Sequence, residues 1–124
     1  MISSDLLTQS ISQNINQALT EDIGDGDITA RLIPEQEQAK AMVITRDAMV
    51  LAGQPWVDAL FKQLDPSVSV KWLHPEGTHL NANDAFLELS GNARSLLSGE
   101  RPALNFIQTL SAVATKTANY VALL

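Results

Sequence analysis

The last part of the chain, from Pro102 to the C-terminus, predicts a helix that is apolar on nearly all sides. Its large apolar residues are joined by small ones, so that few polar faces remain: Ala103, Phe106, Ile107, Leu110, Val113, Ala114 and Ala118. A helix of this kind is buried inside a larger body or an interface. With 124 residues, the chain is long enough for one domain with a modest core. That core is too small to surround the helix, so we expect a second domain or subunit to cover it.

The same predicted helix ends in the sequence NYVALL without the features that normally end a helix, which are a Gly, a Pro or a basic last turn. Two leucines at a free carboxyl end are typical of an element that continues. We therefore expect a longer protein, in which residues 1–124 form an N-terminal domain and the last helix covers about residues 102–124.

Charge and composition exclude several classes of protein. The formal net charge is −6, so the chain has no general electrostatic affinity for nucleic acid or anionic membrane. It contains no cysteine, which excludes disulfides and thiol catalysis and fits a reducing compartment. The first residues, MISSDLLTQS, lack the basic and apolar regions of a secretory signal. We therefore expect a cytoplasmic protein.

Periodic patterns predict a small α+β fold. Leu7, Ile11 and Ile15 recur at helical spacing, whereas alternation over 68–72 and 85–91 is typical of half-buried strands. The expected helices cover residues 4–20, 53–65 and 102–124, and the expected strands cover 39–46, 48–51, 68–72 and 85–91. This order predicts a small antiparallel sheet with helices packed on it, an open sandwich.

The acidic stretch EDIGDGDIT, residues 21–29, predicts a turn and not a calcium site. An EF-hand loop needs a closing glutamate at its twelfth position, which is Ile33 when the count starts at Asp22. We expect Asp27 to cap a short helical segment, ITARLI, that Pro34 ends.

His74 and His79 frame the turn-rich sequence HPEGTH, with Glu76 between them. Three such side chains can ligate a metal, but their spacing matches no helical metal motif and is typical of a hairpin turn. We therefore expect exposed loop residues and no metal site. The chain also lacks the G-x-S-x-G, P-loop and dinucleotide motifs, so no catalytic residue is predicted.

Arg101 directly precedes Pro102, which suits the first position of the predicted last helix. A helix start carries partial positive charge and unsatisfied amides, so a cation there is unfavourable unless an anion binds beside it. Backbone amides and a guanidinium would together hold such an anion, supplied by a partner chain or by a substrate. For Arg94, at the same predicted helix-turn-helix corner, we expect a solvated side chain.

Several blocks of the sequence resemble the N-terminal part of the quinolinate phosphoribosyltransferase family, also called nicotinate-nucleotide pyrophosphorylases. They are ALTEDIGDGDITARLIP, VITRDAMVLAG, LDPSVSVKW and ARSLLSGERPALNFIQTLSAVATKTANYV, in the family's order and spacing from about Ala18 to Val121. Two positions depart from the family pattern. Pro102 stands where a hydroxyl or small residue follows GER, and HPEG replaces a common Asp-Gly turn.

The resemblance implies a glycosyltransferase that joins quinolinate to phosphoribosyl pyrophosphate and releases pyrophosphate and CO₂. Its product would be nicotinate mononucleotide, in de novo NAD biosynthesis, with Mg²⁺ carried on the pyrophosphate. It also implies an α/β barrel after this domain, and a homodimer in which the N-terminal domain covers the partner's barrel. Arg101 would then bind a quinolinate carboxylate in the partner subunit's site. Catalytic residues would lie beyond Leu124, so this chain alone is expected to be inactive and to bind no cofactor.

Alternatives from other classes remain open at this point. Paralogues from molybdenum-uptake operons and nicotinate-specific relatives share the architecture that the resemblance implies, with different substrates. A non-catalytic interaction module is a second class. A biotinyl or lipoyl carrier is excluded, because Lys71 lies within a predicted strand and not at a hairpin tip.

Overall fold

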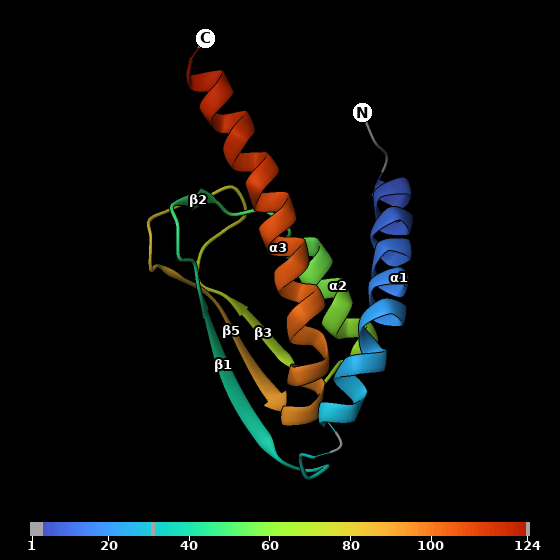
Figure 1. Cartoon of the computed structure of the whole chain (residues 1–124). Helices are drawn as coiled ribbons and strands as arrows, with labels where there is room; N and C mark the ends of the chain where they lie inside the picture. Colours follow the sequence, from blue (N-terminus) through green and yellow to red (C-terminus); the bar gives the residue numbers. More distant parts are fainter. Residues whose placement is uncertain (1–3, 31, 124) are drawn as a thin grey trace.

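The computed structural model describes residues 4–30 and 32–123 of the chain (Figure 1). The elements follow one another as α1 (Ser4–Ala30), β1 (Gln38–Ile44), β2 (Met49–Val50), α2 (Gln54–Leu64), β3 (Ser69–Trp72), β4 (His79–Leu80), β5 (Ala85–Asn92) and α3 (Ala93–Ala122). The predicted α+β class is confirmed. The added strand is β4, which the sequence analysis had assigned to a turn-rich segment.

β5 is the central strand of the main sheet, whose order is β1-β5-β3 with both pairs antiparallel. Leu87 of β5 pairs with Val43 of β1 on one side and with Trp72 of β3 on the other. Phe86 and Leu87 are each only 1% exposed. Because successive strand residues point to opposite faces, both faces of β5 are covered. β2 and β4 form a separate short antiparallel pair.

α3 packs against both the main sheet and the other two helices (Figure 1). It contacts β1 and β5 on one side and α1 and α2 on the other. The stripe predicted for α1 is confirmed at Ile11 and Ile15, which are buried in the same core as Ile107 of α3, whereas it is wrong at Leu7, which is exposed. Among the described helices, none combines the length and the apolar character that crossing a bilayer requires.

The helix predicted at residues 53–65 is confirmed as α2. Val57, Leu60 and Phe61 are buried on one face of it at helical spacing. Gly53, just before α2, has a φ of 113°, in the left-handed region that favours glycine. A Cβ at this position would also lie 3.2 Å from Ile107 Cδ1. Conformation and space therefore both require glycine where α2 begins.

The turn predicted at residues 21–29 is wrong, because α1 continues as one helix to Ala30. Extending an existing helix adds a hydrogen bond for each residue, whereas ending it and restarting at Asp27 would require a second nucleation. The two glycines in the extension each cost about 1 kcal/mol relative to alanine, and the helix continues through both. The continuation of the predicted ITARLI segment at Arg31 lies outside the described residues.

The predicted start of the last helix at Pro102 is also wrong, because α3 begins at Ala93. Asn92 caps the helix: its Oδ1 accepts hydrogen bonds from the backbone N–H groups of Arg94 at 3.0 Å and Ser95 at 3.2 Å. Pro102 lies inside α3 and is buried. An interior proline costs about 3 kcal/mol, which the packing of this long helix offsets.

Candidate functional site

Arg101, the candidate substrate-binding residue, lies on the exposed surface of α3, about two turns after the helix begins. The predicted conflict between this cation and the positive end of a helix is therefore absent. The anion site expected from unsatisfied amides at a helix start is absent at this position too. What remains of the hypothesis is an exposed guanidinium in the sequence GER, followed by a buried proline.

A groove of about 1080 Å³ runs between α3 and the segment 43–49. Leu104 and Gln108 line it, and they follow Arg101 at i+3 and i+7 on the same face of the helix. Arg46 and Lys116, both exposed, also line this groove. Its lining therefore combines two cations, one acid (Asp47) and apolar side chains, and Arg101 precedes the lining residues on α3.

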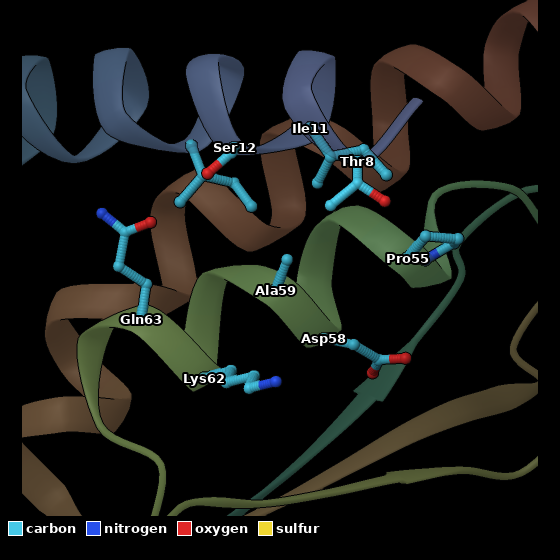
Figure 2. A pocket seen from close by; sticks show the side chains of 9 residues that line it. Thr8, Ile11, Ser12, Pro55, Asp58, Ala59, Lys62 and Gln63 are labelled. Atoms are coloured by element: carbon cyan, nitrogen blue, oxygen red, sulfur yellow. The ribbon is translucent and has the colours of Figure 1, made fainter. Parts of the chain in front are cut away.

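A second groove, of about 630 Å³, lies between α1 and α2 (Figure 2). Its apolar lining comes from Ile11, Ile15 and Ala59, and its residues are all from these two helices. Asp58 Oδ1 is engaged, because it accepts a hydrogen bond from Trp72 Nε1 at 2.7 Å. No residue of α3 lines this groove, so it is separate from the surface that carries Arg101.

Arg94 is not the solvated side chain that the sequence predicted. Its Nε donates a hydrogen bond to the backbone oxygen of Ile33 at 2.6 Å, and its Nη1 lies 3.7 Å from Glu35 Oε1. Its side chain is 31% exposed. Arg94 therefore ties the segment before β1 to the first turn of α3, and the predicted helix-turn-helix corner is one continuous helix.

The segment around His74 and His79 supports the start of α2. The Glu76 carboxylate accepts hydrogen bonds from the backbone N–H groups of Gly53 at 2.9 Å and Gln54 at 3.3 Å. Gln54 Nε2 donates to the backbone oxygen of His74 at 2.7 Å. A carboxylate beside the first amides of a helix also complements the helix dipole. Within the described parts of the chain, no group of acidic, histidine or cysteine side chains is arranged to hold a metal.

Two hydroxyl groups of α3 hold the segment that contains β2. Ser111 Oγ accepts from the backbone N–H of Ala52 at 3.0 Å and donates to the oxygen of the same residue at 3.1 Å. Thr115 Oγ1 accepts from the backbone N–H of Val50 at 2.9 Å. These two hydroxyl groups form hydrogen bonds with backbone N–H and C=O groups of Val50 and Ala52, as the backbone of a neighbouring strand would. The sequence does not reveal these roles, because a contact across about sixty residues leaves no local pattern.

Asp65, at the end of α2, joins this helix to the first turn of α3. Its Oδ1 accepts hydrogen bonds from the hydroxyl of Ser67 at 2.6 Å and from the backbone N–H of Ser67 at 3.0 Å. Its Oδ2 accepts from the hydroxyl of Ser95 at 2.6 Å. These hydrogen bonds, those from Ser67 foremost, hold the pKa of the Asp65 carboxyl below its usual value.

The fold and these residues define a class of domain. It is a small α+β unit, without a recognisable metal-binding cluster in its described residues, that presents an arginine on a helix extending beyond its own core. The solved structures that match this fold are of longer chains, and the match covers only part of each of them. The nicotinate-nucleotide pyrophosphorylase from Francisella tularensis matches with a TM-score of 0.88 and 38% identity, over 99% of this chain and 42% of that one. NadC from Streptococcus pyogenes matches with a TM-score of 0.84 and 36% identity, over 91% and 41%.

The sequence comparisons lead to the family. The profile described as "Quinolinate phosphoribosyl transferase, N-terminal domain" matches residues 27–111, more than half of the chain. The chloroplastic nicotinate-nucleotide pyrophosphorylase [carboxylating] of rice, Oryza sativa subsp. japonica, is 38% identical over 112 residues, which is 89% of this chain and 30% of the rice protein. The chain belongs to the quinolinate phosphoribosyltransferase family and matches its N-terminal domain. It spans about a third of the length of the curated relatives it matches.

Proposed function

We propose that the chain is the N-terminal part of an enzyme that makes nicotinate mononucleotide, pyrophosphate and CO₂ from quinolinate and phosphoribosyl pyrophosphate. The proposal rests on the family membership and on relatives whose names carry this activity, including a probable nicotinate-nucleotide pyrophosphorylase of Synechocystis that is 38% identical over 107 residues. In this proposal, the catalytic residues belong to a following domain, and the chain alone is inactive. The rice relative is named as chloroplastic, so a cytoplasmic location remains a prediction.

The role of this domain in the proposed reaction is to supply Arg101 to a carboxylate of quinolinate. The observation that carries this role is the exposure of Arg101 within the sequence GER on α3. A guanidinium matches the two oxygens of a carboxylate with parallel hydrogen bonds. Since the residue is exposed on the surface of its own domain, we propose that the carboxylate lies in another body, the partner subunit of a homodimer.

Magnesium enters the proposed reaction with the substrate and not through this chain. The described residues contain no cluster of acids or histidines that fits the ion. Mg²⁺ prefers one or two carboxylates together with phosphate oxygens. We therefore propose that the pyrophosphate group carries the ion and that a following domain supplies any protein ligands.

Replacing Arg101 in the full-length enzyme tests the proposed role. Arg101→Ala should raise the KM for quinolinate by about 30-fold or more, because a desolvated carboxylate that loses its charged partner costs roughly 2 to 5 kcal/mol. The KM for phosphoribosyl pyrophosphate should stay nearly unchanged. Arg101→Lys should recover part of the loss, since a lysine keeps the charge without the bidentate geometry.

A matched control is available on the sheet. Lys71→Ala removes another exposed cation, on the edge strand β3, and should leave both KM values at the wild-type level. An unchanged quinolinate KM in Arg101→Ala would overturn the proposed role. Loss of folding in that variant would instead assign Arg101 a structural role.

A further inference from the structure

Gly99, two residues before Arg101, lies against α2, close to Phe61 and Leu64. The two helices are in contact and run side by side (Figure 1). A Cβ placed on Gly99 would lie 2.8 Å from Phe61 Cζ and 3.1 Å from Leu64 Cδ2, and closer still to Phe61 Cε1. Carbon atoms pack at about 3.5 to 4.0 Å. A single methyl group at Gly99 therefore requires a displacement of about 1 Å.

The ring of Phe61 has no space into which it can withdraw. Its side chain is 1% exposed and belongs to the same buried cluster as Val57, Leu60 and Leu96. Well-packed interiors resist such movement, because side chains occupy nearly all of the space. The displacement must then fall on α3, which has to move away from α2.

The turn of α3 at Gly99 is also less constrained by its own hydrogen bonds than an ordinary helical turn. Pro102 has no amide hydrogen, so the carbonyl of Ser98 lacks the usual donor four residues later. The position of this turn therefore depends more strongly on side-chain packing. Gly99 and Pro102 are both buried and lie on either side of Arg101 in the sequence.

Gly99 and Arg101 face nearly opposite directions, because two residues turn an α-helix by about 200°. Gly99 packs on α2 and is buried, whereas Arg101 is exposed. The closeness with which α3 approaches α2 therefore sets how far the Arg101 side chain projects from the domain. A methyl group on one side of the helix would shift the guanidinium on the other.

We propose that Gly99 is a positioning residue for Arg101: its contact with Phe61 fixes α3 at the depth from which Arg101 reaches the substrate carboxylate. The inference rests on the proposed function, in which Arg101 binds that carboxylate. In the sequence GER, Gly99 would act through its packing on Phe61, and Arg101 would act by binding the carboxylate.

The test uses Gly99→Ala in the full-length enzyme. We expect the quinolinate KM to rise about 10- to 100-fold, as for a misplacement of about 1 Å, while kcat and the KM for phosphoribosyl pyrophosphate change by less than about threefold. The double variant Gly99→Ala/Phe61→Leu should recover most of the affinity, because leucine lacks the ring atoms that meet the new methyl group. If Gly99→Ala does not fold, Phe61→Leu alone loosens the same contact and should itself raise the quinolinate KM.

Leu80→Ala is the matched control, because Leu80 is 2% exposed and lies in β4, away from the contact between α2 and α3. It should lower the thermal midpoint without changing the quinolinate KM. An equal rise of KM in Leu80→Ala, or a folded double variant without recovery, would overturn the inference. Arg101→Ala, measured alongside, separates the two proposals. If it raises KM and Gly99→Ala does not, only the positioning role is wrong, whereas no effect in Arg101→Ala refutes the proposed function.

Discussion

The two halves of α3 both carry apolar side chains, but these side chains lie in different environments. In the half up to Ser111, the buried positions are spaced one turn apart: Leu96, Gly99, Pro102, Ala103, Ile107 and Ser111. In the half after Ser111, Val113 is 60% exposed, Tyr120 67% and Val121 60%. Figure 1 shows this second half extending past the other elements toward the C-terminus. One helix therefore serves as the centre of a core at one end and as an uncovered apolar surface at the other.

The difference shows which constraints come from this domain. The spacing of small and large residues in the first half follows from the helices and strands packed against it. Nothing in the described residues accounts for the apolar side chains of the second half. Contiguous apolar surface on a protein commonly marks an interface, so the expectation that another body covers this half remains a prediction.

We expect the largest difference in the free energy of unfolding between alanine variants of two apolar residues of α3. Ile107 is 2% exposed and Val121 is 60% exposed. Ile107→Ala should lower the free energy of unfolding of the 124-residue chain by about 2 to 5 kcal/mol, through lost burial and the cavity left behind. Val121→Ala should change it by less than about 0.5 kcal/mol. Urea denaturation of both variants measures the contrast, and equal losses would show that the second half is packed in the isolated chain.

We expect a smaller difference in stability between variants that remove two hydroxyl groups of α3, those of Ser111 and Thr117. Ser111→Ala removes both hydrogen bonds to the backbone of Ala52 and leaves those buried groups unpaired, at a cost of about 1 to 3 kcal/mol. Thr117 Oγ1 donates only to Val113 O of its own helix, at 2.9 Å. Thr117→Ala should therefore be neutral or slightly stabilising, because alanine favours helix. Hydrogen exchange at the Ala52 amide should accelerate in the Ser111 variant alone, whereas exchange at Val50, whose N–H is bonded to Thr115, should stay unchanged.

The smallest effect concerns pH and the first turn of α3. The pKa of Asp65 is lowered in the folded state by hydrogen bonds from Ser67 and then Ser95, so its ionised form stabilises the fold. This stabilisation is complete above the unfolded-state pKa, near pH 4, and disappears as the pH falls through the lower folded-state pKa. Asp65→Asn should flatten the loss of stability below about pH 4, and Ser95→Ala should flatten it partly. An unchanged acid titration in Asp65→Asn would show that the Ser contacts are not maintained in solution.

Patterns with a short period predicted most of the fold. The helical spacing of Ile11 and Ile15 in α1 and the alternation of β3 were visible because each repeats within one element. The alternation of 85–91 also located β5, but that strand is covered on both faces and is not half-buried. β4 was missed because two residues form no pattern. The start of α3 was predicted at the wrong residue because proline is common at the first position of a helix, and Pro102 suits that position. The actual N-cap, Asn92, is also the last residue of β5, so the sequence before it is typical of a strand.

The contacts around the candidate site were only partly predictable. The physical reason that singled out Arg101 is wrong, since the residue does not lie at a helix start, and its binding role stays a prediction. The hydrogen bond of Arg94 to Ile33 spans 61 residues, and the contact of Gly99 with Phe61 joins two helices. Such contacts depend on how the elements pack, and a single sequence carries no periodic signal for them.

Mixing of subunits tests the central claim most directly, which is that Arg101 acts in the site of the partner subunit. One full-length variant carries Arg101→Ala, and the other is inactivated in the catalytic domain with its N-terminal domain intact. If subunits exchange randomly, half of the dimers are hybrids with one complete site each, so the equal mixture should recover about a quarter of the wild-type activity. If hybrids form, as shown by differently tagged subunits purifying together, and activity stays at the level of the separate variants, Arg101 is not shared across a dimer interface.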